Sequence, residues 1–244
     1  MSLKKTFRTG TTDEAIWEAI NKYNEYELKD NMSDMVVIDI GCHIGGFAYA
    51  CLVRGAKKVY CYEAHPDNYS LACENLSEFA DKVSIHQVAV WRSDNDCATL
   101  KHTGFTYFPG YGPESNTGGG NVWGENGNLE VPTSSLSAII QFVKPEHQTI
   151  DILKFDCEGS EFPILLSIND LSGVQTVLGE YHEFSGQYDY NRIPDKARIK
   201  EYQHYTVENL EKHLNALGFK HWTETRFQNP DGSWTNLGKF RATR

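Results

Sequence analysis

Three carboxylates stand close together in the second half of the chain: Asp156, Glu158 and Glu161. They follow an apolar, strand-like run, so Asp156 and Glu158 are expected at the carboxyl edge of a parallel sheet, where such sheets bind ligands. Like charges so close are costly unless a cation, a shared proton or helix N–H groups compensate. Asp156 is therefore a candidate general base beside a cationic ligand. Glu161 has a structural alternative, as a first-turn acid behind an N-cap at Ser160.

A glycine turn in the first quarter of the chain predicts where that ligand binds. Asp39, Gly41 and Gly45 form the pattern Asp-x-Gly-x-x-x-Gly after an apolar run and before an amphipathic one. Strand, glycine turn and helix make up the βαβ entry that holds nucleotide-like cofactors. Cys42 and His43 stand where a dinucleotide site needs its second glycine. The missing glycine argues against NAD, and the pattern resembles the first motif of S-adenosylmethionine-dependent methyltransferases. We expect His43 to shape the turn.

A second carboxylate completes this expected cofactor site. Glu63 ends the predicted strand 58–63, and at that position it can accept hydrogen bonds from both hydroxyls of a ribose. Asn68 and the segment around Ala89 are weaker candidates for the ribose and the adenine edge. Asp39 is expected to order the glycine turn or to meet the amino group of the ligand.

Composition narrows the class of protein. The 244 residues carry a formal net charge of −10, which argues against nucleic acid and anionic membranes as main partners. The six cysteines form no C-x-x-C pair, so free thiols in a reducing compartment are expected. No apolar run approaches the length of a membrane span. We expect a cytoplasmic protein, and the sequence gives no indication of its oligomeric state.

The remaining pattern predicts one α/β domain over residues 1–244. Five alternating strand and helix units precede a C-terminal antiparallel hairpin, with its strands near 219–227 and 234–242. This order is typical of a Rossmann-like, seven-stranded methyltransferase sheet with helices on both faces. Residues 1–34 are expected to form an N-terminal helical lid that starts with a capping box at Thr11. The segments 103–128 and 182–205 are expected to be acceptor-site insertions.

These motifs together resemble one family. Asp39-Ile40-Gly41 with Gly45, then Glu63, then the stretch 153–161 (Leu-Lys-Phe-Asp-Cys-Glu-Gly-Ser-Glu), are similar to the motifs of FkbM-type S-adenosylmethionine-dependent methyltransferases. The resemblance covers roughly residues 35–182. The chain departs from the family at Ser137, where Asp is common, and in the length of segment 103–128.

The resemblance implies the site residues and the reaction. Glu180 and His182 match a Glu and a His that the family often has after its fifth strand, so they join Asp156 as catalytic candidates. Such an imidazole can accept the proton of a hydroxyl group. No metal ligand set is predicted. The expected cofactor-binding residues are Asp39, Gly41, Cys42, His43, Gly45, Phe47, Glu63, Ala64, Asn68, Ala89, Asp156 and Glu158.

The expected function is O-methylation of a small hydroxylated molecule such as a sugar, a glycoside or a natural product. The Asn/Asp-Pro-Pro-aromatic signature of amino methylation on bases is absent, because Asp156-Cys157-Glu158-Gly159 occupies its place. Two alternatives stay open at this point. One is a non-catalytic module that binds S-adenosylmethionine, and the other is an NAD-dependent oxidoreductase.

Overall fold

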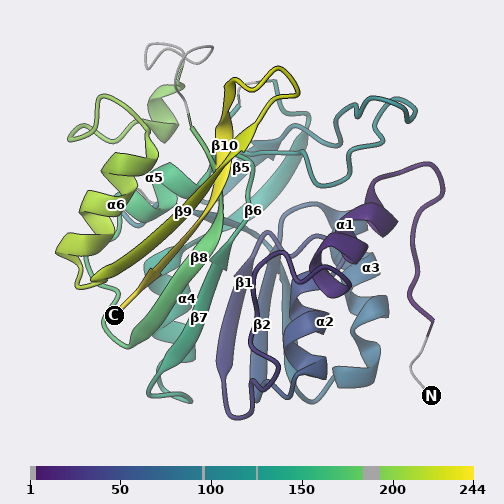
Figure 1. Cartoon of the computed structure of the whole chain (residues 1–244), viewed down its shortest axis with the longest axis horizontal. Helices are drawn as coiled ribbons and strands as arrows, with labels where there is room; N and C mark the ends of the chain where they lie inside the picture. Colours follow the sequence, from purple (N-terminus) through teal and green to yellow (C-terminus); the bar gives the residue numbers. More distant parts are fainter. Residues whose placement is uncertain (1–3, 95–96, 125, 184–192) are drawn as a thin grey trace.

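The computed structural model describes residues 4–94, 97–124, 126–183 and 193–244 (Figure 1). Its centre is a seven-stranded sheet in the order β3-β2-β1-β7-β8-β10-β9. The first five of these strands run parallel, and β10 is antiparallel to both β8 and β9. This confirms the predicted sheet and C-terminal hairpin. The strands are β1 (Val36–Ile40), β2 (Lys58–Glu63), β3 (Val83–Gln87), β7 (Ile150–Phe155), β8 (Val174–His182), β9 (His221–Gln228) and β10 (Trp234–Thr243).

Helices cover both faces of the sheet because the central strands are apolar on both sides (Figure 1). In β1, Val37 packs with residues of three helices on one face, while Ile38 and Ile40 belong to the core of the other face. The first group is α1 (Asp13–Asn21), α2 (Gly46–Val53) and α3 (Pro66–Asn75), and the second is α4 (Leu136–Val143), α5 (Glu161–Leu166) and α6 (Val207–Ala216). Two short 3₁₀ turns, η1 (Ser77–Phe79) and η3 (Asp195–Ala197), complete the described helices.

A second, three-stranded sheet was not predicted. Its order is β4-β6-β5, built from β4 (Ala89–Trp91), β5 (Thr99–His102) and β6 (Leu129–Ser135). After Gln87, the last residue of β3, the chain leaves the main sheet and forms β4. The small sheet therefore holds both ends of segment 103–128. Of the other expected insertion, 182–205, residues 184–192 lie outside the described part of the chain.

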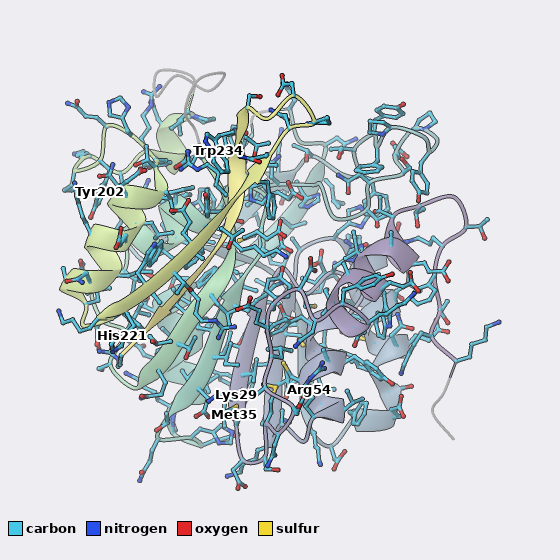
Figure 2. The ribbon with its side chains drawn as sticks, viewed as in Figure 1. Lys29, Met35, Arg54, Tyr202, His221 and Trp234 are labelled. Carbon is cyan, nitrogen blue, oxygen red and sulfur yellow. The ribbon has the colours of Figure 1, made fainter. Side chains whose placement is uncertain are left out.

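The N-terminal segment packs over the carboxyl side of the main sheet. Helix α1 packs on α2, and its N-cap is Thr12 rather than the predicted Thr11, without a side-chain capping bond. Met35, directly before β1, and Arg54, directly after α2, lie at the opposite side, where β1 begins (Figure 2). Trp234 lies at the outer end of the hairpin (Figure 2). No helix of the described residues is long and apolar enough to cross a membrane.

Candidate active site

The turn after β1 depends on glycine for two different reasons. Gly41 has φ +72°, and a Cβ there would collide with the backbone carbonyl oxygen of Asp156 at the end of β7. Gly45 has φ +90°, and a Cβ there would meet the side chain of Leu76 directly after α3, so this glycine serves the packing against that residue. His43 between them also has positive φ, at +52°. The chain therefore turns sharply after β1, with the backbone of Gly41 in close contact with the backbone of Asp156 after β7.

A cavity of about 220 Å³ opens beside this turn, at the carboxyl edge of the parallel strands. Its walls come from the ends of β1, β2, β7 and β8, from α1 and from the segment between β5 and β6. This is the edge at which open α/β sheets bind their ligands. Among the residues that line it are Gly41, His43, Glu63, Ala64, Asn68, Ala89, Asp156, Glu158 and Glu180.

Glu63 is fixed by the backbone on both sides of its carboxylate. One oxygen accepts a hydrogen bond from the His43 N–H at 2.9 Å, and the other accepts one from the His65 N–H at 2.9 Å. The Asn68 side-chain nitrogen lies 3.4 Å from the same oxygen as His65. Burial raises the pKa of Glu63, and these N–H groups partly oppose the shift. The carboxylate is thus preorganised at the cavity wall, with lone pairs left for hydroxyl donors.

A polar network joins α1 and segment 103–128 above the cavity. The Thr117 hydroxyl donates to Asp13 at 2.7 Å and lies 2.8 Å from His43 Nε2. Arg8 binds both oxygens of Asp13 and also donates to Asn68 at 2.7 Å. Burial opposes ionisation of Asp13, but hydrogen bonds from His43, Arg8 and Thr117 outweigh it and hold the Asp13 pKa well below its usual range. The N-terminal segment and segment 103–128 are thus joined to each other beside the cavity-lining residues His43 and Asn68.

An ion pair between Lys154 and Asp39 holds the glycine turn in place. Lys154 in β7 is 2% exposed, lies 3.1 Å from Asp39, and donates to the Gly41 carbonyl oxygen at 2.9 Å. Burial disfavours the ammonium, but the charges of Asp39 and Asp156 outweigh it and raise the pKa of Lys154 above its usual value. Asp39 is fully buried, so it orders the turn through Lys154 and does not reach the cavity.

The wall formed by the ends of β7 and β8 is acidic. Asp156 accepts a hydrogen bond from the Tyr26 hydroxyl at 3.0 Å, and Glu158 has a left-handed backbone at φ +52°. Trp123 donates to the carbonyl oxygen of Glu158 at 2.8 Å. Burial raises the pKa of Glu158 to about 7, with His182 opposing the shift. Burial, followed by the charge of Asp156, raises the pKa of Glu180 to about 8. The wall has an excess of carboxylates, as the sequence predicted.

His182 lies behind this wall, between two carboxylates. Its Nε2 is 3.3 Å from Glu158, and its Nδ1 is 3.5 Å from Glu161. Glu161 is fixed in turn by N–H groups of Cys157 and Gly159, at 2.6 and 2.8 Å. Burial disfavours the charged imidazole, but Glu161 and then Glu158 outweigh it and raise the pKa of His182 to about 10. Glu161 therefore pairs with His182, besides being a helix first-turn acid.

The predicted site residues thus divide by position. Eight of the twelve expected cofactor-binding residues line the 220 Å³ cavity, whereas Cys42 and Phe47 line only a smaller neighbouring one next to Lys154. Asp39 and Gly45 line neither of these two cavities. Asp156 and Glu180 line the 220 Å³ cavity, and His182 contacts its lining residue Glu158.

Several residues of the site were missed by the sequence analysis. Thr117 and Asp13 meet across more than 100 positions of the chain, so no local pattern could join them. His102 lines the cavity from the end of β5, and burial, with His65 adding to it, lowers the pKa of His102 to about 4. Lys154 did give a signal, because a lysine inside an apolar strand has to find a buried partner.

The fold and this cavity together define the class. Five parallel strands followed by an antiparallel hairpin, with a glycine turn facing a fixed carboxylate, describe a Rossmann-like S-adenosylmethionine-dependent methyltransferase. The residues fit that cofactor, since Glu63 has free lone pairs for the ribose hydroxyls and the acidic wall can face a sulfonium. The model of the methyltransferase FkbM domain matches residues 39–220. The chain therefore belongs to the FkbM methyltransferase family, which confirms the resemblance and favours methyl transfer over the NAD alternative.

One solved structure supports the fold, and two others match it less well. A putative S-adenosylmethionine-dependent methyltransferase from Listeria monocytogenes has 12% identity and a TM-score of 0.50, over 94% of this chain and 99% of that one. Methyltransferase FkbM from Methylobacillus flagellatus KT has 12% identity and a TM-score of 0.46, over 92% of this chain and 47% of that one. TrmK from M. capricolum, solved with S-adenosylhomocysteine, has 10% identity and a TM-score of 0.45, over 87% and 63%. No curated protein matches the sequence.

Proposed function

We propose that the chain is an O-methyltransferase whose acceptor is a hydroxyl group of a small molecule such as a sugar, a glycoside or a natural product. The observation that carries this proposal is the position of Asp156 and Glu180, which line the same cavity as the cofactor residues Gly41 and Glu63. A hydroxyl acceptor must lose its proton as the methyl group arrives, and carboxylates can accept it. The net charge of −10 supports a small acceptor over a nucleic acid.

The residues of the chain have two tasks in this reaction. When bound, S-adenosylmethionine supplies an electrophilic methyl group on a positively charged sulfur. Glu63 and Asn68 would hold its ribose, and alignment of donor and acceptor can remove on the order of 7–11 kcal/mol of barrier. Asp156 or Glu180 would take the proton, an effect worth roughly 10²–10⁴-fold. His182 does not line the cavity, so its geometry favours a positioning role toward Glu158 over the direct base role expected from the sequence.

The test is product formation from labelled cofactor. The purified full chain is incubated with methyl-labelled S-adenosylmethionine and a panel of hydroxylated metabolites, and products are analysed by mass spectrometry. The proposal expects a product that is one methyl group heavier and modified on oxygen. Glu180→Gln should lower kcat by roughly 10²–10⁴-fold if Glu180 is the base. Asp156→Asn is assayed beside it, and Glu130→Gln on the exposed face of β6 is the matched control.

Two outcomes would overturn the proposal. Methylation found on nitrogen, carbon or a macromolecule would assign a different acceptor. Tight binding of S-adenosylhomocysteine without any methylated product over the whole panel would favour the non-catalytic binding module.

A further inference from the structure

Asp156, Glu158 and His182 bring three metal-ligating atoms together at the acidic wall. One donor atom from each residue lies within 4.8 Å of the other two. Two ligands at about 2.1 Å from one ion can be at most about 4.2 Å apart, so a pair at the outer limit of that range has to contract by roughly half an ångström. Two carboxylates and an imidazole are a donor set that Mn²⁺ and Zn²⁺ accept.

The imidazole of His182 has a carboxylate beside each of its ring nitrogens. A ligating histidine almost always directs its second ring nitrogen to a carboxylate or a carbonyl, which fixes the ring and the tautomer. Here Nδ1 faces Glu161, 3.5 Å away, and two backbone N–H groups hold that carboxylate in place. Nε2 is left to face Glu158 at 3.3 Å, on the side of the cluster.

A separate observation in the same cavity also indicates a missing ligand. Ser160 lines the same cavity as Asp156 and Glu158, is 1% exposed, and its hydroxyl has no hydrogen-bond partner among the described residues. A buried hydroxyl without a partner is costly unless a bound molecule or ion supplies one.

Charge supports the same conclusion. Asp156, Glu158, Glu161 and Glu180 crowd one wall, and in the described part of the chain the cations within 4.0 Å of them are Lys154 and His182. Lys154 is already committed to Asp39. The wall therefore has more carboxyl groups than cationic partners.

We infer that Asp156, Glu158 and His182 form a divalent metal site, with Glu161 as the positioning residue for His182. This inference rests on the proposed function for its role: the ion would bind the acceptor hydroxyl and polarise it. The acceptor oxygen then forms its bond to the methyl carbon as the carbon–sulfur bond breaks. The hydroxyl proton leaves to the carboxylate of Glu180 or to water, and S-adenosylhomocysteine is released.

The experiment measures binding of Mn²⁺ to the full chain in the presence of S-adenosylhomocysteine. The protein is stripped with a chelator and dialysed, and Mn²⁺ is titrated while the electron paramagnetic resonance signal of the free ion is followed. The inference expects one saturable site. Glu158→Gln and His182→Gln should each weaken binding at least tenfold, and Glu161→Gln by 10- to 100-fold through loss of orientation.

Controls separate a site from general attraction to negative charge. Glu25→Gln removes one carboxylate from the wall of the same cavity without touching the cluster, and it should leave Mn²⁺ affinity within twofold. With Zn²⁺ as a diamagnetic probe, the ¹⁵N resonance of His182 Nε2 should shift to that of a metal-bound nitrogen. Thermal melts check that each variant folds, and Glu158→Gln keeps the test valid if the histidine variant does not.

The inference is overturned if no saturable Mn²⁺ binding occurs, or if the Glu158 and His182 variants bind like the parent chain. The cluster would then be an ion-pair network. This failure differs from failure of the proposed function, because a chelator-treated chain that methylates a hydroxyl at the full rate refutes only the metal site. A chain that binds Mn²⁺ at the cluster but methylates no hydroxyl refutes only the acceptor.

Discussion

Replacing Glu63 by Gln tests the cofactor site with the smallest change of shape. Both carboxylate oxygens accept backbone N–H groups, from His43 and His65, and they are proposed to accept the ribose hydroxyls as well. The substitution removes the charge and turns one acceptor into a donor that faces an N–H group. A hydrogen bond to a charged group contributes about 1.5–3 kcal/mol. Losing one such bond predicts roughly 10- to 150-fold weaker binding of S-adenosylhomocysteine.

Isothermal titration calorimetry with S-adenosylhomocysteine measures this affinity directly. The matched control is Glu130→Gln, an exposed glutamate of β6 outside the cavity, which should bind within twofold of the parent. A thermal melt is needed beside it, because the new donor also weakens the turn of the apo protein. If the Glu63→Gln variant is folded and binds within twofold of the parent, Glu63 does not hold the ribose and the cofactor site is misplaced.

Two further predictions concern stability. Lys154→Met leaves Asp39 buried without its cation and should lower the free energy of unfolding, measured in urea, by roughly 3–5 kcal/mol. Adding Asp39→Asn to the same chain should restore part of this loss, and an unchanged urea midpoint in Lys154→Met would refute the ion pair. His102 stays neutral in the fold down to about pH 4, whereas the unfolded chain takes up a proton below about pH 6.5. The contribution of His102 to the free energy of unfolding should therefore fall by roughly 3 kcal/mol as pH drops from 6.5 to 4. His102→Asn should reduce the pH dependence of stability by this amount, and an equal pH dependence in the variant would contradict the lowered pKa of His102.

The sequence predicted what depends on local pattern. Gly41 follows a buried strand and Glu63 ends the next one, so neighbouring parallel strands place them at one edge. The fixed order of strands and helices then predicted the sheet and the hairpin. The same reasoning brought Asp156 and Glu158 to that edge, because β7 lies beside β1.

What the sequence did not predict depends on contacts between distant segments. Gly45 was expected at the ligand, which stays a prediction, and its contact with Leu76 directly after α3 is one that only the packed fold reveals. The segment 103–128 was expected at the acceptor, yet its Thr117 is joined to Asp13 and His43 on the cofactor side. That acceptor role stays a prediction. His182 was expected as the base, which stays a prediction, and its contacts with Glu158 and Glu161 join segments that no local pattern connects.

A crystal structure of the chain with S-adenosylhomocysteine tests the central claim most directly. The account predicts the ribose hydroxyls on Glu63, the amino-acid part beside Gly41, and the sulfur directed toward Asp156. A cofactor bound elsewhere, or bound in the cavity with its ribose away from Glu63, would contradict it.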